Sequence, residues 1–88
     1  MTITRQMVAD RLSAYLQGKQ TLASIVSWAE EAMREGELAE PDFTVIRDVV
    51  ARLGLADVTA FGLTWEDAVD MLDRLGYRAT VEIQAQRR

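Results

Sequence analysis

Carboxylates are the side chains of this sequence with the clearest potential for chemistry. The 88 residues include 14 aspartates and glutamates against 10 lysines and arginines, with no histidine and no cysteine. The commonest general base, the commonest metal ligand and the usual activator of a serine nucleophile are therefore missing from the sequence. We expect that the protein is not an enzyme, and that it has no catalytic residues, no cofactor and no metal site.

One group of carboxylates keeps a metal-binding alternative open. Glu66 and Asp70 are four positions apart, and Asp70 and Asp73 are three apart, so a helix would place them on one face, where they could share a hard divalent cation. Acidic residues near the start of a helix are also favoured by the helix dipole alone. We therefore interpret this group as a solvated face.

The densest acidic segment covers residues 30–42. Six acidic residues and one arginine give it a formal charge of -5, compared with -4 for the whole chain. Concentrated charge speeds association with an oppositely charged surface, and a neighbouring aromatic side chain can anchor the contact. The alternative is a solvated helix end, with the tryptophan closing the edge of the core. The candidate partner-binding residues are Trp28, Glu31, Glu35, Glu37 and Glu40.

Four segments with apolar residues at helical spacing must position these side chains. They predict helices near residues 4–17, 21–35, 41–53 and 64–75. The expected fold class is mostly α, a compact four-helix bundle that forms a single helical domain over residues 1–88.

Capping residues support these boundaries. Thr21 precedes the second helix, and Thr64 with Asp67 forms a variant of the capping box at the fourth. Pro41 suits the first turn of the third helix. Glycine follows the last apolar residue of each segment, as is common at helix ends.

The apolar stripes of the second and third helices predict most of the core. The second stripe contains Leu22, Ile25, Val26, Ala29 and Met33. The third contains Phe43, Ile46, Val49, Val50 and Leu53. Every one of these side chains is expected to pack against another helix.

After the last helix, the apolar period changes from helical to alternating, which predicts a short β-strand near residues 78–84. A lone strand leaves its backbone groups unpaired. Residues 1–4, residues 58–61 or the same strand of a second copy could pair with it, and the last arrangement would form a homodimer.

Composition indicates where the protein acts. The sequence has no cysteine and no apolar run of about 18 residues, so we expect a soluble, cytoplasmic protein without a membrane partner. A pI near 4.7 disfavours nucleic acid and favours a basic protein partner. The alternative function is a DNA-binding regulator of the helix-turn-helix type, in which the third helix presents Arg47 and Arg52.

Three short segments carry a resemblance to a known class of proteins. They are Tyr15-Leu16-Gln17-Gly18, Trp28-Ala29 and Leu75-Gly76-Tyr77. With these three segments, the last of which closes the fourth helix, the chain resembles small bacterial immunity proteins of the colicin-D and contact-dependent growth inhibition kind. The resemblance implies an antitoxin-like inhibitor whose acidic face occupies the basic active site of a toxic nuclease, partly by imitating nucleic-acid charge.

Overall fold

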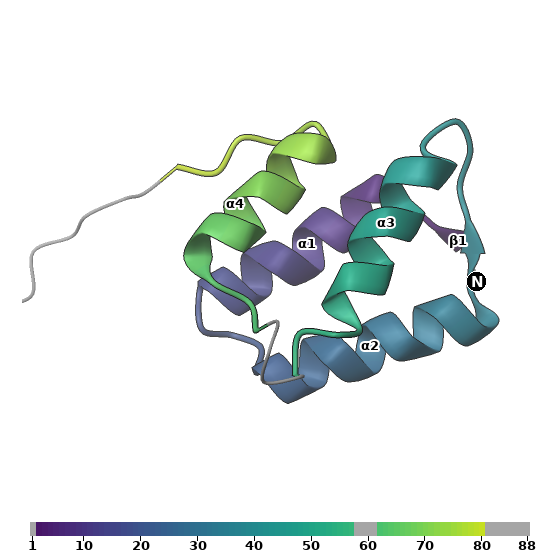
Figure 1. Cartoon of the computed structure of the whole chain (residues 1–88). Helices are drawn as coiled ribbons and strands as arrows, with labels where there is room; N and C mark the ends of the chain where they lie inside the picture. The colour runs from purple at the N-terminus through teal and green to yellow at the C-terminus, as the bar shows by residue number, and fades with distance from the viewer. Residues whose placement is uncertain (1, 58–61, 81–88) are drawn as a thin grey trace, which may run out of the picture.

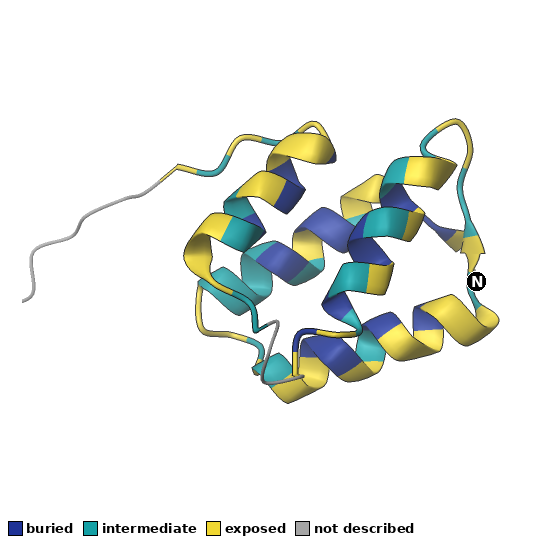
Figure 2. Cartoon of the chain, in the orientation of Figure 1, coloured by how far each residue is buried: buried dark blue, intermediate teal, exposed yellow. Residues whose placement is uncertain are grey.

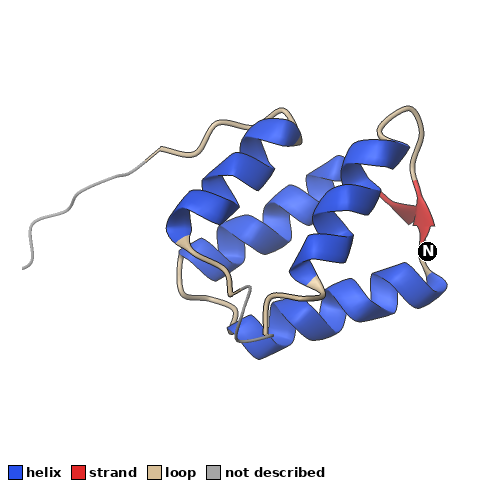
Figure 3. Ribbon diagram, in the orientation of Figure 1, coloured by secondary structure: helices blue, strands red, loops and turns tan. Residues whose placement is uncertain are grey.

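The computed structural model describes residues 2–57 and 62–80 and is mostly helical, at 63%. These residues form four helices and two short strands (Figures 1 and 3). The helices are α1 (Arg5–Leu16), α2 (Leu22–Glu35), α3 (Phe43–Leu53) and α4 (Trp65–Arg74). The strands are β1 (Thr2–Ile3) and β2 (Glu37–Leu38). The prediction of four helices is confirmed, and each boundary lies within about two residues of its expected place.

The helices bury their apolar faces against one another. Helix α2 packs mainly against α3, whereas α1 contacts α2, α3 and α4 (Figure 1). The buried residues of all four helices belong to one core cluster, and the buried parts of the ribbons lie where the helices face one another (Figure 2). Most of the predicted stripe is confirmed as core, namely Ile25, Val26, Ala29, Ile46, Val49, Val50 and Leu53. None of the helices in the described ranges is long and apolar enough to cross a membrane.

Threonines begin three of the helices by accepting hydrogen bonds. The Thr4, Thr21 and Thr64 hydroxyls accept from backbone amides three residues later, at 3.2, 3.1 and 3.1 Å. At α4 the contact is reciprocal, because the Thr64 amide donates to the Asp67 carboxylate at 3.0 Å. The predicted capping box is therefore confirmed.

This capping box makes stability depend on pH. Hydrogen bonds with the backbone and side chain of Thr64 lower the pKa of Asp67 below its usual 3.8, and Arg52 adds to the effect. Because the folded pKa is the lower one, the stabilisation is present above the unfolded value and disappears as pH falls through the folded value. Thr64→Ala should cost about 1 kcal/mol of unfolding free energy at neutral pH, and less in acid.

Urea denaturation at neutral pH and well below pH 3.8 measures this difference. Thr44→Ala is the matched control, because Thr44 is exposed within α3 and does not cap a helix. A Thr64→Ala deficit that stays the same in acid would contradict a contribution of the Thr64 hydroxyl to the lowered pKa of Asp67, since the backbone amide of residue 64 is kept in this variant.

The third helix begins later than expected. We predicted Pro41 within its first turn, but α3 begins at Phe43, with Asp42 at the N-cap position and Pro41 in the preceding connection after a cis peptide bond. The connection is longer because residues 37–38 leave α2 as a strand before the chain turns back into α3.

The prediction of a C-terminal strand is wrong for those of its residues that the structure describes. Residues 78–80 form no strand, and residues 81–84 lie outside the described residues, as does the homodimer contact expected there. The strand pair lies elsewhere: β1 and β2 run parallel, with Thr2 opposite Glu37 and Ile3 opposite Leu38. The alternating pattern alone led to the wrong prediction, because a strand also needs a neighbouring strand to pair with. Residues 37–38 have that neighbour in β1, which is held beside α2 by the burial of Ile3.

Candidate functional site

Met33 and Phe43 were predicted to be core residues, but both are exposed. Their side chains are 47% and 42% exposed, although both fit the apolar stripes of their helices. Met33 lies in the last turns of α2, where the ribbon extends past the helices that cover its middle (Figure 2). Phe43 is the first residue of α3. Helical periodicity identifies a face, but burial also requires a neighbour at that level of the helix.

These two side chains line a groove of about 490 Å³ at the junction of α2, β2 and α3. We call it the Met33–Phe43 groove. Its lining residues are Ala32, Met33, Gly36, Glu37, Leu38, Glu40, Phe43 and Arg47. Two of the large exposed apolar side chains of the described chain therefore meet in one concave surface, instead of being scattered over the molecule.

Negative charge borders this groove. Glu37 and Glu40 are exposed, and within residues 2–57 and 62–80 neither carboxylate forms an ion pair. The cation of the groove, Arg47, is already paired: its Nε and a terminal nitrogen donate to Asp48 at 3.3 and 3.2 Å. The groove therefore presents two glutamates whose charge is not balanced by a contacting cation.

The guanidinium of Arg47 also lies against the aromatic wall. Its Cζ atom is 5.9 Å from the centroid of the Phe43 ring, at the distance of a cation–π contact. Asp48, which holds this guanidinium, is 3.7 Å from Arg74 of α4 as well. One face of Phe43 is thus already occupied by a cation of the chain itself.

The structure divides the predicted partner-binding residues into two groups. Glu37 and Glu40 line the groove, whereas Trp28, Glu31 and Glu35 do not. Trp28 is half-buried and packs against the core, and the Arg11 guanidinium lies 5.1 Å from its ring centroid. Trp28 therefore closes the edge of the core between α2 and α1.

Glu31 and Glu35 are exposed on α2, as predicted for solvent-facing acids. They are about one helical turn apart and lie on the same side of α2 as Trp28, opposite the side that carries Met33. They extend the acidic surface without contributing to the groove. A partner centred on the groove would meet Glu37 and Glu40 first.

Sequence reasoning missed Met33 and Phe43 because it assigned both to the core. A usable signal was present in their neighbours. Met33 is four residues before Glu37, and Phe43 is three residues after Glu40, so each flanks the acidic connection. An apolar residue at the end of a stripe next to a charged connection is a candidate for exposure.

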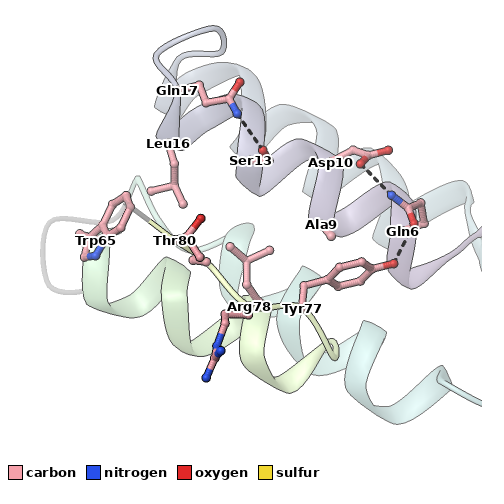
Figure 4. Close-up of a pocket in the computed structure, with 12 residues that line it drawn as sticks. Gln6, Ala9, Asp10, Ser13, Leu16, Gln17, Trp65, Tyr77, Arg78 and Thr80 are labelled. Carbon is pink, nitrogen blue, oxygen red and sulfur yellow. Dashed lines mark hydrogen bonds between the residues drawn. The ribbon is translucent and has the colours of Figure 1, made fainter. Parts of the chain in front are cut away.

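A larger groove, of about 700 Å³, lies between α1, α4 and residues 77–80 (Figure 4). Trp65 is 46% exposed at the border of this groove. Polar side chains on its α1 wall bond to one another or to Tyr77: Gln6 donates to Asp10 at 3.0 Å, and the Tyr77 hydroxyl donates to Gln6 at 2.8 Å. Its charged lining residues, Asp10 and Arg78, have opposite signs, so this groove lacks the excess of negative charge found at the Met33–Phe43 groove.

The α3 arginines proposed for DNA reading are engaged within the chain. Arg47 bonds Asp48, as described above, and Arg52 donates to the Gly62 carbonyl at 3.1 Å and to Asp67 at 3.5 Å. A reading helix needs its basic side chains available to phosphates and bases. The arrangement therefore favours a protein partner over the alternative function.

One carboxylate of α4, that of Asp67, already accepts a hydrogen bond in the capping box of its helix. No group of three or more acidic side chains in the described ranges is arranged to hold a metal ion. Comparisons with protein-family models, with curated proteins and with solved structures gave no match.

Proposed function

We propose that this protein is a cytoplasmic interaction module that binds a basic protein partner through the Met33–Phe43 groove. One observation carries the proposal: exposed Met33 and Phe43 meet in a concave surface bordered by Glu37 and Glu40. Six of its eight lining residues belong to residues 30–42, the segment with the highest density of negative charge. The apolar side chains and the charged side chains of the groove would contribute to binding in different ways.

Affinity would come mainly from covering the apolar side chains. Fully burying one large apolar side chain contributes about 1.5 to 3 kcal/mol, and Met33 and Phe43 each have somewhat less than half of their surface left to bury. The glutamates would speed the encounter and select basic surfaces, because charge at an interface governs association rate and specificity more than affinity.

The finer proposal is that the protein is an immunity protein or antitoxin. The resemblance to small bacterial immunity proteins supports it, as does the match between an acidic groove and the cationic active site of a nuclease. On this proposal the four helices act as one compact bundle that holds the α2 and α3 walls of the groove at a fixed separation.

Three charge reversals of equal size test the location of the site. The paired substitutions are Glu37→Lys with Glu40→Lys at the groove, Glu31→Lys with Glu35→Lys beside Trp28, and Asp70→Lys with Asp73→Lys on α4. All six acids are exposed, and each pair changes the net charge equally. The partner is captured from an extract of the source cell with the unaltered protein, identified, purified and then titrated against all variants.

We expect the groove reversal to weaken binding by about tenfold or more at physiological salt, where charges beyond about 8 Å are largely screened. The α4 reversal should have little effect, because its charges lie on a different helix. Equal losses for all three pairs would show that only net charge matters. A loss confined to the Glu31 and Glu35 pair would move the site to the Trp28 side of α2.

A further inference from the structure

The Met33–Phe43 groove offers a surface for each part of an arginine side chain. We propose that it receives an arginine of the basic partner, with the guanidinium stacked on Phe43 and its N–H groups donating to Glu37 or Glu40. This inference rests on the proposed function and goes beyond it by naming the side chain that is recognised. Three features of the lining lead to it.

The first feature is an apolar surface for the stem. Met33 is exposed, Leu38 is half-buried, and Ala32 of α2, although buried, is part of the lining. Long cationic side chains place their methylene groups along such surfaces while the charged end stays near water. Lysine and arginine are equally suited to this part of the groove.

The second feature distinguishes arginine from lysine. A guanidinium is planar and weakly hydrated and stacks well on an aromatic ring, whereas an ammonium is compact and strongly hydrated. Arg47 of the chain itself shows that a guanidinium fits against Phe43, with Cζ 5.9 Å from the ring centroid. Phe43 is 42% exposed, so its ring retains accessible surface for an incoming group.

The third feature is the pair of acceptors. Glu37 and Glu40 lie in the same lining, and their carboxylates form no ion pair within the described part of the chain. A carboxylate can accept two parallel N–H bonds from a guanidinium, which a lysine ammonium cannot supply in that geometry. The lining therefore favours arginine over lysine in both stacking and hydrogen bonding.

Arg47 gives the inference a second, independent consequence. Its guanidinium contacts Phe43 and carries positive charge into the groove, so it competes with an incoming arginine for the ring and repels it. Arg47→Ala should therefore strengthen binding of an arginine-containing ligand by about two- to fivefold, the range for one exposed cation–π contact. Loss of a purely structural residue would not strengthen binding.

Blocked pentapeptides with two arginines, two lysines or two citrullines between alanines are the probes. Each is titrated into isotope-labelled protein, and amide shifts are followed by NMR for the unaltered chain, Arg47→Ala and Phe43→Leu. We expect the arginine peptide to shift the amides of Met33, Leu38 and Phe43 and to bind about two- to fivefold tighter than the lysine peptide. Citrulline, which is neutral, should bind weakest.

Phe43→Leu keeps the groove apolar and should abolish the preference for arginine over lysine. Equal binding of the two cationic peptides at the groove, with no effect of Phe43→Leu, would overturn arginine recognition and leave the proposed function standing. Shifts confined to other surfaces would overturn both. The spectrum of each variant without peptide shows whether it is folded, and Phe43→Met, which is also apolar and not aromatic, replaces Phe43→Leu if the latter is not.

Discussion

Leu53→Ala is expected to lower the free energy of unfolding by about 2 to 5 kcal/mol. Leu53 is fully buried in the last turn of α3, within the cluster formed by all four helices. Removing its isobutyl group leaves a cavity that close-packed neighbours fill only partly. A domain of this length has only about 4 to 13 kcal/mol of stability in total, so this one change can remove a large fraction of it.

Leu55→Ala provides a matched control two residues further along the chain. Leu55 is 45% exposed in the turn after α3, so the same substitution should change stability by less than about 0.5 kcal/mol. Urea denaturation of the two variants measures both effects. Similar losses for Leu53→Ala and Leu55→Ala would mean that the apolar face of α3 is assigned wrongly.

Gly36→Ala is expected to destabilise the protein by about 1 to 3 kcal/mol through crowding. The backbone angles of Gly36, φ -82° and ψ 150°, suit any residue, so conformational strain is not the cause. An added Cβ would instead lie 2.7 Å from the Ala32 carbonyl oxygen and 2.7 Å from Cγ1 of Ile3. The buried Ile3 side chain must therefore shift, and the backbone at position 36 must move away from the Ala32 carbonyl.

Gly54→Ala should have the opposite sign. Gly54 has helical angles, φ -63° and ψ -16°, and its nearest neighbours would lie 3.5 Å or more from the new Cβ. An alanine that fits without strain restricts the unfolded chain and stabilises by about 0.4 to 1 kcal/mol. Denaturation curves for the two variants test the pair, and a Gly36→Ala protein as stable as the unaltered chain would contradict the close packing of Ile3.

Helices were predictable because their signals are local. The Thr64 hydroxyl and the Asp67 carboxylate are three residues apart, so the capping box could be identified without knowing the fold. Buried positions in the middle of a helix, such as Ile46 and Val50, were also predicted correctly. These positions are covered whatever the exact packing angle, because the centre of a stripe faces the neighbouring helices.

Features that depend on distant parts of the chain were not predictable in the same way. The exposure of Met33 follows from where the neighbouring elements end, and the pairing of Ile3 with Leu38 joins segments far apart in sequence. Trp28, chosen as an anchor, turned out to pack against the core with Arg11 over its ring. The acidic segment was recognised, but the apolar side chains that make it a groove were not.

The parallel pair of β1 and β2 has a consequence for the acidic groove. Glu37 and Leu38 contribute to the groove, and they are held in place by Thr2 and Ile3, while the Ala39 amide donates to the Ile3 carbonyl at 2.9 Å. The shape of the groove thus depends on residues that precede the first helix. Deleting β1 would therefore remove the backbone partners of Glu37 and Leu38 and loosen one wall of the groove, although neither residue of β1 lines it.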